Sequence, residues 1–333
     1  EEIMAQKKKL TKKQKNKIKK LPLPILLLLV LVVGGYFGWV YVIKPYLDKQ
    51  DPVTYSSSQD ENGFYYYSTA PNNTYYTSAN NLVGEALKDE LNEVLNTGFN
   101  PTSYAQAKEI LAEADQSLDD PTKVMNVYDG VFVNAVWDST SWHREHVWPN
   151  SRLGMARVTE SGKNQASDLH NLRAITPRVN SSRSDRVYTE GAGIWATTEV
   201  GGFYPGDAHK GDVARIILYM AVMYQDILLL TDDLDLLLDE SNHYLPEGAR
   251  MGQLTLLLKW HKEDPVDDFE RNRNEVIYEA QGNRNPFIDK PEYVHLIWEG
   301  KTIEDLTEPL TEEEPTVMMM QMHYFIERKV LFS

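Results

Sequence analysis

Hydrophobic and polar positions follow a helical period over much of the chain. From Leu82 to Gly98, apolar residues recur every three or four positions, which predicts an amphipathic helix that ends near the glycine. The same spacing predicts helices over 104–114, 213–224, 254–260 and 269–281. Two short β-prone runs, 123–128 and 131–136, flank Asp129-Gly130, a dipeptide suited to a tight hairpin turn. The pattern therefore predicts an α+β domain in which helices are in excess.

An uncharged apolar run of 23 residues, 21–43, precedes this region. As a helix rising ~1.5 Å per residue, it is long enough to cross a bilayer's hydrocarbon core of ~30 Å. Lysines are concentrated before the run, so the positive-inside rule places the basic segment 1–20 in the cytoplasm and the rest outside. A cleaved signal peptide is the alternative, but no A-x-A-like site follows the run. We therefore expect one transmembrane helix, a cell-membrane location and an extracellular domain.

Composition divides the remainder of the chain into three parts. Residues 44–74 are rich in Ser, Tyr, Asn and Asp without a period, which is typical of an exposed extracellular stalk. The folded domain is expected over 75–300. Residues 301–333 are acidic and then Met-rich, and we expect a solvated tail of no assigned role.

The net charge of −15 hides opposite local balances. Residues 51–333 contain 23 Lys and Arg against 46 Asp and Glu, whereas 141–186 contain seven Arg and one Lys against four acidic residues. A basic island in an acidic domain is the more specific signal. The chain has no cysteine, which excludes disulfides, thiolate metal sites and cysteine nucleophiles, so any metal must bind oxygen or imidazole.

The basic island contains three ordered segments. The first, 142–149, alternates enough to predict a short strand ending at a proline, and 167–172 predicts a second strand. Pro177 then opens a helical stretch on which Asn180, Arg183 and Arg186 share one stripe. The local order is therefore strand, loop, strand, helix.

Side chains in these segments suit phosphodiester hydrolysis. A neutral imidazole such as that of His146 can activate water near neutral pH. A carboxylate such as Glu145 and an amide oxygen suit a hard cation such as Mg²⁺, and arginines can neutralise phosphates. Because neighbours in a regular strand point to opposite sides, one site can use both Glu145 and His146 only where the backbone bends.

These segments resemble a known family. Arg144-Glu145-His146-Val147-Trp148-Pro149, then Asp168-Leu169-His170-Asn171-Leu172, then Val179-Asn180-Ser181-Ser182-Arg183, are similar to motifs of the bacterial endonuclease I family. Residues 211–215 and 281–289 resemble later signatures of that family, so the resemblance covers about 75–298. It implies a ββα-metal (His-Me) finger within the helix-rich domain.

The resemblance also implies the residues' roles. His146 would be the general base, and Glu145 and Asn180 would bind one catalytic Mg²⁺, for which Mn²⁺ could substitute. The implied reaction is cleavage of DNA and RNA without sequence preference, giving 5′-phosphorylated ends. Phosphate contacts are expected from Arg183 first, and then from Arg144, Arg152, Arg157 and Arg186. Supporting roles in the site or the fold are expected for Asp168, His170 and Asn171.

Two alternatives remain beside this interpretation. His143 and His146 lie three residues apart, a spacing that zinc ligands can have, but no third ligand is evident and His143 is expected to be an exposed neighbour. The chain could also be a catalytically silent surface protein that binds nucleic acid or another partner. Loss of the Glu, His or Asn would favour that alternative, and all three are present. No protein partner is predicted.

Overall fold

The computed structural model describes residues 58–68 and 74–309. The predicted membrane span, 21–43, and most of the acidic tail lie outside these residues. Within the described part of the chain, no helix combines the length and the apolar character that a membrane crossing needs.

The predicted hairpin is confirmed. Strands β1 (Lys123–Met125) and β2 (Phe132–Asn134) pair antiparallel, with Lys123 opposite Asn134. Gly130 lies in the connecting turn at φ 62°, a left-handed conformation that glycine adopts without steric cost. The Asp-Gly dipeptide therefore marked the turn correctly.

The basic island forms two strands and a helix. Strand β3 (His143–His146) pairs antiparallel with β4 (Leu172–Ile175), and α6 (Pro177–Arg183) follows. The register places His146 opposite Leu172. The fold is a mixture of α and β, as expected, and its local order in this region is β, β, α.

Two details of that prediction were wrong. The second strand does not cover 167–172, because the Asp168 side chain accepts the His170 backbone N–H at 2.9 Å and caps the 3₁₀ turn η5 (Leu169–Asn171). The strand begins only at Leu172. Helix α6 ends at Arg183, where Ser184 turns to φ 49°, so Arg186 lies beyond the helix and shares no helical stripe with Asn180.

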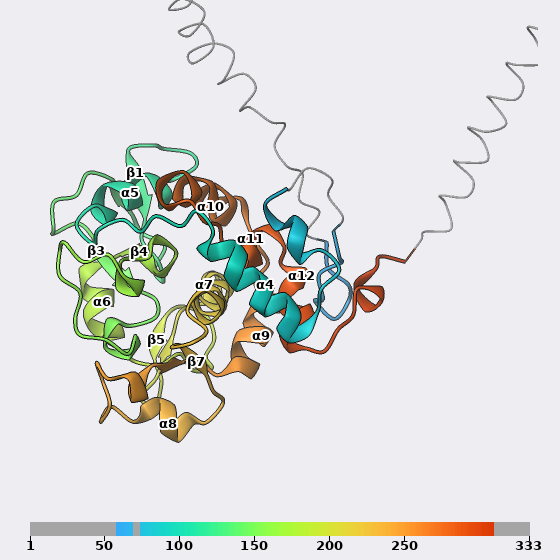
Figure 1. Ribbon diagram of the computed structural model, residues 1–333. Coiled ribbons are helices and arrows are strands. Elements are labelled where there is room, and N and C mark those ends of the chain that lie inside the picture. Colours follow the sequence, from blue (N-terminus) through green and yellow to red (C-terminus); the bar gives the residue numbers. More distant parts are fainter. Residues whose placement is uncertain (1–57, 69–73, 310–333) are drawn as a thin grey trace, which may run out of the picture. The chain divides into compact units, whose positions relative to one another are not determined.

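Helix α7 (Lys210–Met223) forms the centre of the larger core. Its residues from Gly211 to Met223 are all buried, including the charged residues Asp212 and Arg215 in its first turns. Figure 1 shows it almost end-on, with other helices around it. It packs against α4 (Gly84–Asn96), α9 (Leu254–Glu263) and α11 (Pro286–Asp289), while α4 also packs against α12 (Glu292–Trp298).

A smaller core supports the strands of the basic island. Helices α5 (Ala107–Ala114) and α10 (Asp268–Gln281) pack together and bury Leu111 and Ile277 with Trp142 and Leu172. The helices predicted over 82–98, 104–114, 213–224, 254–260 and 269–281 are thus confirmed, with small shifts at their ends.

The remaining elements are short, and none was predicted. The pairs are β5 (Ala196–Thr197) with β6 (Phe203–Tyr204), antiparallel, and β7 (Leu229–Leu230) with β8 (Arg250–Met251), parallel. The helical turns are α8 (Leu234–Leu238), η2 (Thr74–Ala79), η3 (Asn150–Arg152), η4 (Gln165–Ser167), η6 (Pro246–Gly248) and η7 (Glu304–Leu306).

The exposed-stalk prediction is wrong for residues 58–68. Tyr65 is fully buried, and its backbone N–H donates to Nε2 of His295 at 3.1 Å. The Tyr67 N–H donates to the carbonyl of Leu306 at 2.7 Å, and Leu306 is itself buried. The folded part therefore begins before residue 75 and continues beyond residue 300.

Candidate active site

One cavity of about 430 Å³ collects several residues that the sequence singled out. Its lining includes Glu145, His146, Asn180, Arg144 and Arg157. Strand β3 ends at His146, so the two adjacent side chains reach the cavity where the strand stops. Both residues line one cavity although they are neighbours in a strand, where side chains of a regular strand alternate.

His146 is held by a backbone carbonyl and an aromatic ring. Its Nε2 lies 2.8 Å from the carbonyl oxygen of Ala166, in η4, and its ring stacks on Tyr104 with centroids 5.2 Å apart. Burial is the main cause that lowers the pKa of His146 to about 4; the hydrogen bond to Ala166 opposes this shift, and the positive charges of Arg144 and Arg157 contribute to it. The imidazole is therefore neutral at pH 7, and with Nε2–H donating to Ala166, the lone pair lies on Nδ1.

Glu145 is a buried carboxyl group with two partners on one oxygen. Its Oε1 accepts the Tyr128 hydroxyl at 2.9 Å and lies 3.4 Å from Nε of Arg183. The Tyr128 hydroxyl is also 2.5 Å from that of Tyr188. Burial raises the pKa of Glu145 to about 7, and Arg183 and the Tyr128 hydrogen bond oppose that rise. Oε2 has no hydrogen bond within the described residues, which leaves it for a ligand.

Asn180 enters the cavity from α6. Its Nδ2 lies 3.4 Å from Nδ1 of His143, so the amide nitrogen faces the histidine and Oδ1 is left for another partner. His143 is half-buried and in contact with this amide, whereas the sequence predicted an exposed neighbour without a role.

The Oε2 atom of Glu145 and the Oδ1 atom of Asn180 fit a hard cation. Mg²⁺ binds through one or two protein oxygens and keeps several waters, and Glu145 and Asn180 line one cavity. The zinc alternative gains no support, because the described residues contain no group of three or more His, Cys, Asp or Glu placed to bind a metal.

Two of the predicted phosphate contacts are corrected by burial. Arg183 is fully buried, donates to the Val147 carbonyl at 2.9 Å and packs over the Tyr188 ring at 4.5 Å. Arg152 is also buried, and its Nε donates to the carbonyl of Asp185 at 2.9 Å. Both guanidinium groups are occupied by the protein, so neither is free to bind a phosphate.

The other three arginines differ in availability. Arg144 lines the cavity but forms an ion pair with Glu160 at 2.8 Å, and its guanidinium lies 3.4 Å from the Tyr104 ring centroid. Arg186 is half-buried, donates to the Ser182 carbonyl at 2.6 Å and does not line the cavity. Arg157 is exposed, lines the cavity and has no ion pair among the described residues. Arg157 is therefore the best placed of the five to contact phosphate.

Asp168, His170 and Asn171 are buried in the folded core. Asp168 accepts hydrogen bonds from the hydroxyls of Tyr219 and Tyr224, each at 2.9 Å. Asn171 accepts the Trp148 N–H at 2.7 Å and donates back to the Trp148 carbonyl at 3.1 Å. The Nε2 atom of His170 lies 3.2 Å from the carbonyl oxygen of Asn283. These contacts agree with the supporting role that the sequence analysis expected.

Several residues of the site gave no signal in the sequence analysis. Tyr128 bonds to Glu145, Tyr104 stacks on His146, and Asp185 and Tyr244 line the cavity. Tyr128 directly precedes the Asp-Gly turn and has φ 75°, a conformation that is rare for tyrosine. Of these four residues, Tyr128 alone had a usable signal in the sequence, which is its position next to the Asp-Gly turn.

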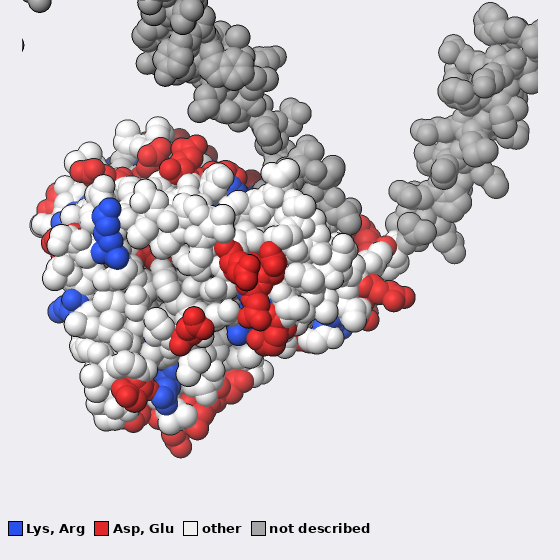
Figure 2. All heavy atoms as spheres, viewed as in Figure 1, with Lys and Arg blue, Asp and Glu red and all other residues white. Residues whose placement is uncertain are grey.

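Burial also reduces the positive charge that the basic island exposes. Of the island's cations, Arg173 is buried in ion pairs with Asp115 and Asp212, so the exposed positive charge is smaller than the sequence count implies. Figure 2 shows acidic side chains gathered over α4, where Glu85, Asp89 and Glu93 are exposed. The acidic surface repels phosphates, so cations at the cavity become the attractive sites for a polyanion.

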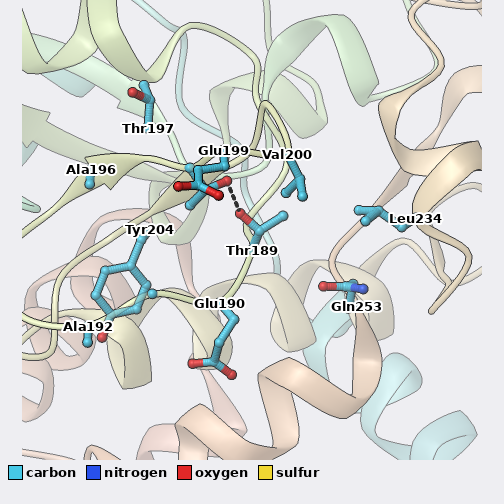
Figure 3. Close-up of a pocket in the computed structure, with 12 residues that line it drawn as sticks. Thr189, Glu190, Ala192, Ala196, Thr197, Glu199, Val200, Tyr204, Leu234 and Gln253 are labelled. Atoms are coloured by element: carbon cyan, nitrogen blue, oxygen red, sulfur yellow. Dashed lines mark hydrogen bonds between the residues drawn. The ribbon is translucent and has the colours of Figure 1, made fainter.

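A second cavity of about 520 Å³ lies beside β5 and β6 (Figure 3). It is lined by Glu190, Tyr204 and Gln253, among others, and a hydrogen bond of 2.7 Å joins the hydroxyls of Thr189 and Thr198. None of the residues singled out by the sequence lines it, so the cavity at β3 and α6 is the candidate active site.

Known proteins resemble this chain over the same region. The family model for endonuclease I matches residues 83–292. An extracellular ribonuclease of Bacillus amyloliquefaciens is 37% identical over 243 residues, which cover 69% of this chain and 80% of that protein. An extracellular ribonuclease of Bacillus subtilis is 36% identical over 242 residues, with the same coverage of 69% and 80%. An extracellular deoxyribonuclease of Aeromonas hydrophila is 25% identical over 158 residues, 44% of this chain and 60% of that protein. The chain therefore belongs to the endonuclease I family of nucleases.

Proposed function

We propose that the cavity at β3 and α6 hydrolyses phosphodiester bonds of both RNA and DNA outside the cell, with one Mg²⁺ as cofactor. The observation that carries the proposal is that Glu145, His146 and Asn180 line a single cavity. Relatives named extracellular ribonuclease and extracellular deoxyribonuclease support action on both polymers. The apolar run 21–43 supports attachment to the membrane through one N-terminal helix.

His146 acts as the general base. Its Nδ1 lone pair takes a proton from a water molecule, while Nε2–H keeps its hydrogen bond to the Ala166 carbonyl and so fixes the ring's orientation. The water attacks phosphorus opposite the 3′ oxygen, the bond to that oxygen breaks, and the product carries a 5′ phosphate. The negative charge of a phosphate bound at the cavity would raise the pKa of the imidazole above about 4 and so make it a stronger base.

Glu145 and Asn180 would hold the cation. The carboxylate would supply Oε2 and the amide Oδ1, because their other polar atoms are engaged with Tyr128 and His143. A bound Mg²⁺ would stabilise negative charge on the phosphate and on the leaving oxygen. Tyr128 and Arg183 keep Glu145 in place and favour its ionised form.

Contacts to phosphate account for the lack of sequence preference. Arg157 can bind a phosphate oxygen, and such a contact carries no information about the base. Mn²⁺ is expected to replace Mg²⁺, since the two oxygens suit either ion.

The test uses the full chain with supercoiled plasmid and with RNA, each in Mg²⁺ or in EDTA. Wild type is expected to cut both polymers only with metal. The His146→Ala variant should be at least ~100-fold slower, as expected for loss of a general base, while it unfolds at the same urea concentration. Asn180→Ala should instead raise the Mg²⁺ concentration needed for half-maximal rate. A pure wild type that retards plasmid on a gel but cuts neither polymer in Mg²⁺ or Mn²⁺ would replace the proposal with the catalytically silent binding protein.

A further inference from the structure

Tyr244 lies at the same cavity as His146 and was not singled out by its sequence. It belongs to the segment that follows α8, orange in Figure 1. Its side chain lines the cavity, the residue is 38% exposed, and within the described part of the chain its hydroxyl has no hydrogen bond. An exposed aromatic ring at a site for a polyanion needs an explanation other than packing.

The backbone of Tyr244 is held in an unfavourable conformation. Its φ is 63°, which few residues other than glycine adopt. The Tyr244 N–H donates to the Ser151 carbonyl at 2.6 Å, and the neighbouring His243 Nδ1 lies 3.2 Å from Oδ2 of Asp185. The Ser151 hydroxyl donates to the same Asp185 oxygen at 3.0 Å. These contacts fasten the segment to the cavity wall and hold the ring in place.

Strained backbone gathers around this cavity. Ser184, at φ 49°, also lines it, and Tyr128, at φ 75°, bonds to Glu145. Strained residues persist where the surrounding structure requires them, and they are common at functional sites. The position of Tyr244 therefore fits a role in the site better than an accident of a surface loop.

The other aromatic residue of the cavity is already occupied. The Tyr104 ring has the Arg144 guanidinium 3.4 Å from its centroid and the His146 ring stacked at 5.2 Å. Among the residues that the structure describes, Tyr244 makes no ring or cation–π contact. Its face is free to bind a flat, apolar group.

We infer that Tyr244 stacks on a nucleobase of the strand bound at the cavity, next to the phosphate that is cut. The inference rests on the proposed function, because it takes the cavity to bind nucleic acid. Stacking needs a base with a free face, and bases of a duplex have both faces covered by their neighbours. A single-stranded segment of RNA or DNA offers such a face, with Arg157 at a phosphate and Tyr244 at a base.

The experiment uses Tyr244→Gly in the full chain. Glycine removes the ring and accepts φ 63° without strain, so the backbone of the segment is preserved. Dissociation constants for a fluorescent single-stranded DNA oligomer are measured in EDTA, and KM and kcat are measured in Mg²⁺. Loss of one stacked base should weaken binding by about 5- to 150-fold, raise KM and leave kcat nearly unchanged.

Two control variants separate the ring from the loop. Tyr244→Phe keeps the ring and should bind as wild type does. Leu245→Ala changes an adjacent, 48% exposed residue that does not line the cavity, and it should also bind as wild type does. An oligomer made of abasic sugars should bind equally to wild type and to Tyr244→Gly, because it offers no base to stack.

The outcomes separate the two proposals. If wild type cuts nucleic acid and Tyr244→Gly keeps its affinity and KM, the stacking role is wrong and the proposed function stands. If the glycine variant is weakened equally toward the abasic oligomer, the ring acts on the backbone or the loop, and stacking is again wrong. If wild type cuts nothing, the proposed function fails, and binding in EDTA still decides whether Tyr244 stacks on a base.

Discussion

Replacing Arg183 by methionine distinguishes a buried support from a phosphate contact. The guanidinium is fully buried, lies 3.4 Å from the Glu145 carboxylate and donates to the Val147 carbonyl at 2.9 Å. Methionine fills similar space without the charge or the donors. Glu145 then loses its cation and two carbonyls lose their donor.

The magnitude follows from these lost contacts. Removing one partner of a buried ion pair costs about 3–5 kcal/mol, because the remaining charge is left in a poorly solvated place. We therefore expect Arg183→Met to lower the free energy of unfolding by about 3–5 kcal/mol. The pKa of Glu145, already raised to about 7, should rise further because Arg183 opposes the effect of burial.

The matched control is Arg157→Met, because Arg157 is exposed, lines the cavity and has no ion pair among the described residues. Its free energy of unfolding should change by less than about 0.5 kcal/mol. Its binding of single-stranded DNA should weaken, and the slope of log affinity against log salt should fall by about 0.7, as expected for one lost phosphate contact.

The assays are urea unfolding and DNA titrations in EDTA at several salt concentrations. Arg183→Met, measured where it remains folded, should keep the wild-type salt slope. The reasoning fails if Arg183→Met is as stable as wild type and its salt slope is lower. Those two results together would show that Arg183 contacts phosphate, as the sequence analysis first expected.

Two further predictions concern buried groups that support the site. Burial lowers the pKa of His170 to about 3, so the unfolded chain, with a pKa near 6.5, binds this proton more readily. The neutral His170 imidazole contributes fully to stability above pH ~6.5. As the pH falls toward 3, this contribution to the free energy of unfolding is lost at about 1.4 kcal/mol per pH unit. Wild type should therefore lose about 3 kcal/mol more than His170→Asn between pH 7 and pH 4, and equal losses in urea unfolding would contradict this. Asp168→Asn places an amide N–H₂ among four donors, so we expect a loss of about 2–4 kcal/mol in the same assay, and a loss below 0.5 kcal/mol would show that the network is dispensable.

The helices were predictable because the spacing of apolar residues within a short segment determines which face of a helix is buried. In α4, Leu87, Leu91 and Leu95 lie on one face and are fully buried, so their spacing alone identified the helix and its inner side. The prediction of a strand over 167–172 was wrong, and its cause is also a short-range interaction. The Asp168 side chain satisfies the backbone N–H of His170 and favours a turn where the apolar pattern favoured a strand.

Composition misjudged the segment before residue 75. Residues 58–68 have the polar, aperiodic character of a stalk, yet Tyr65 is fully buried between His261 and His295, with ring centroids 5.0 and 5.7 Å away. Both partners lie about 200 or more positions later in the chain. A pattern within a short window carries no information about contacts at that separation.

The charge of the sequence was a poor guide to the charge that the folded surface exposes. Positions in the motifs and in the loop between the strands predicted phosphate contacts for five arginines, but a guanidinium contributes to a surface only when no internal carboxylate or carbonyl binds it. Arg183 pairs with Glu145 and donates to the Val147 carbonyl, and Arg152 donates to the Asp185 carbonyl. Since a guanidinium cannot lose its proton near neutral pH, burial forces it to bind such acceptors.

The residues that contact Glu145 and His146 also lie outside the motif that contains these two side chains. His146 could be identified from its neighbours in the motif, but the group that orients it is a backbone carbonyl, which every residue has and no side chain marks. Tyr128, which bonds to Glu145, lies in the connection between β1 and β2 and has a positive φ that no side-chain pattern marks. Short motifs thus identify the candidate side chains of this site, whereas the tautomer of His146 and the ionisation of Glu145 depend on how other segments fold against them.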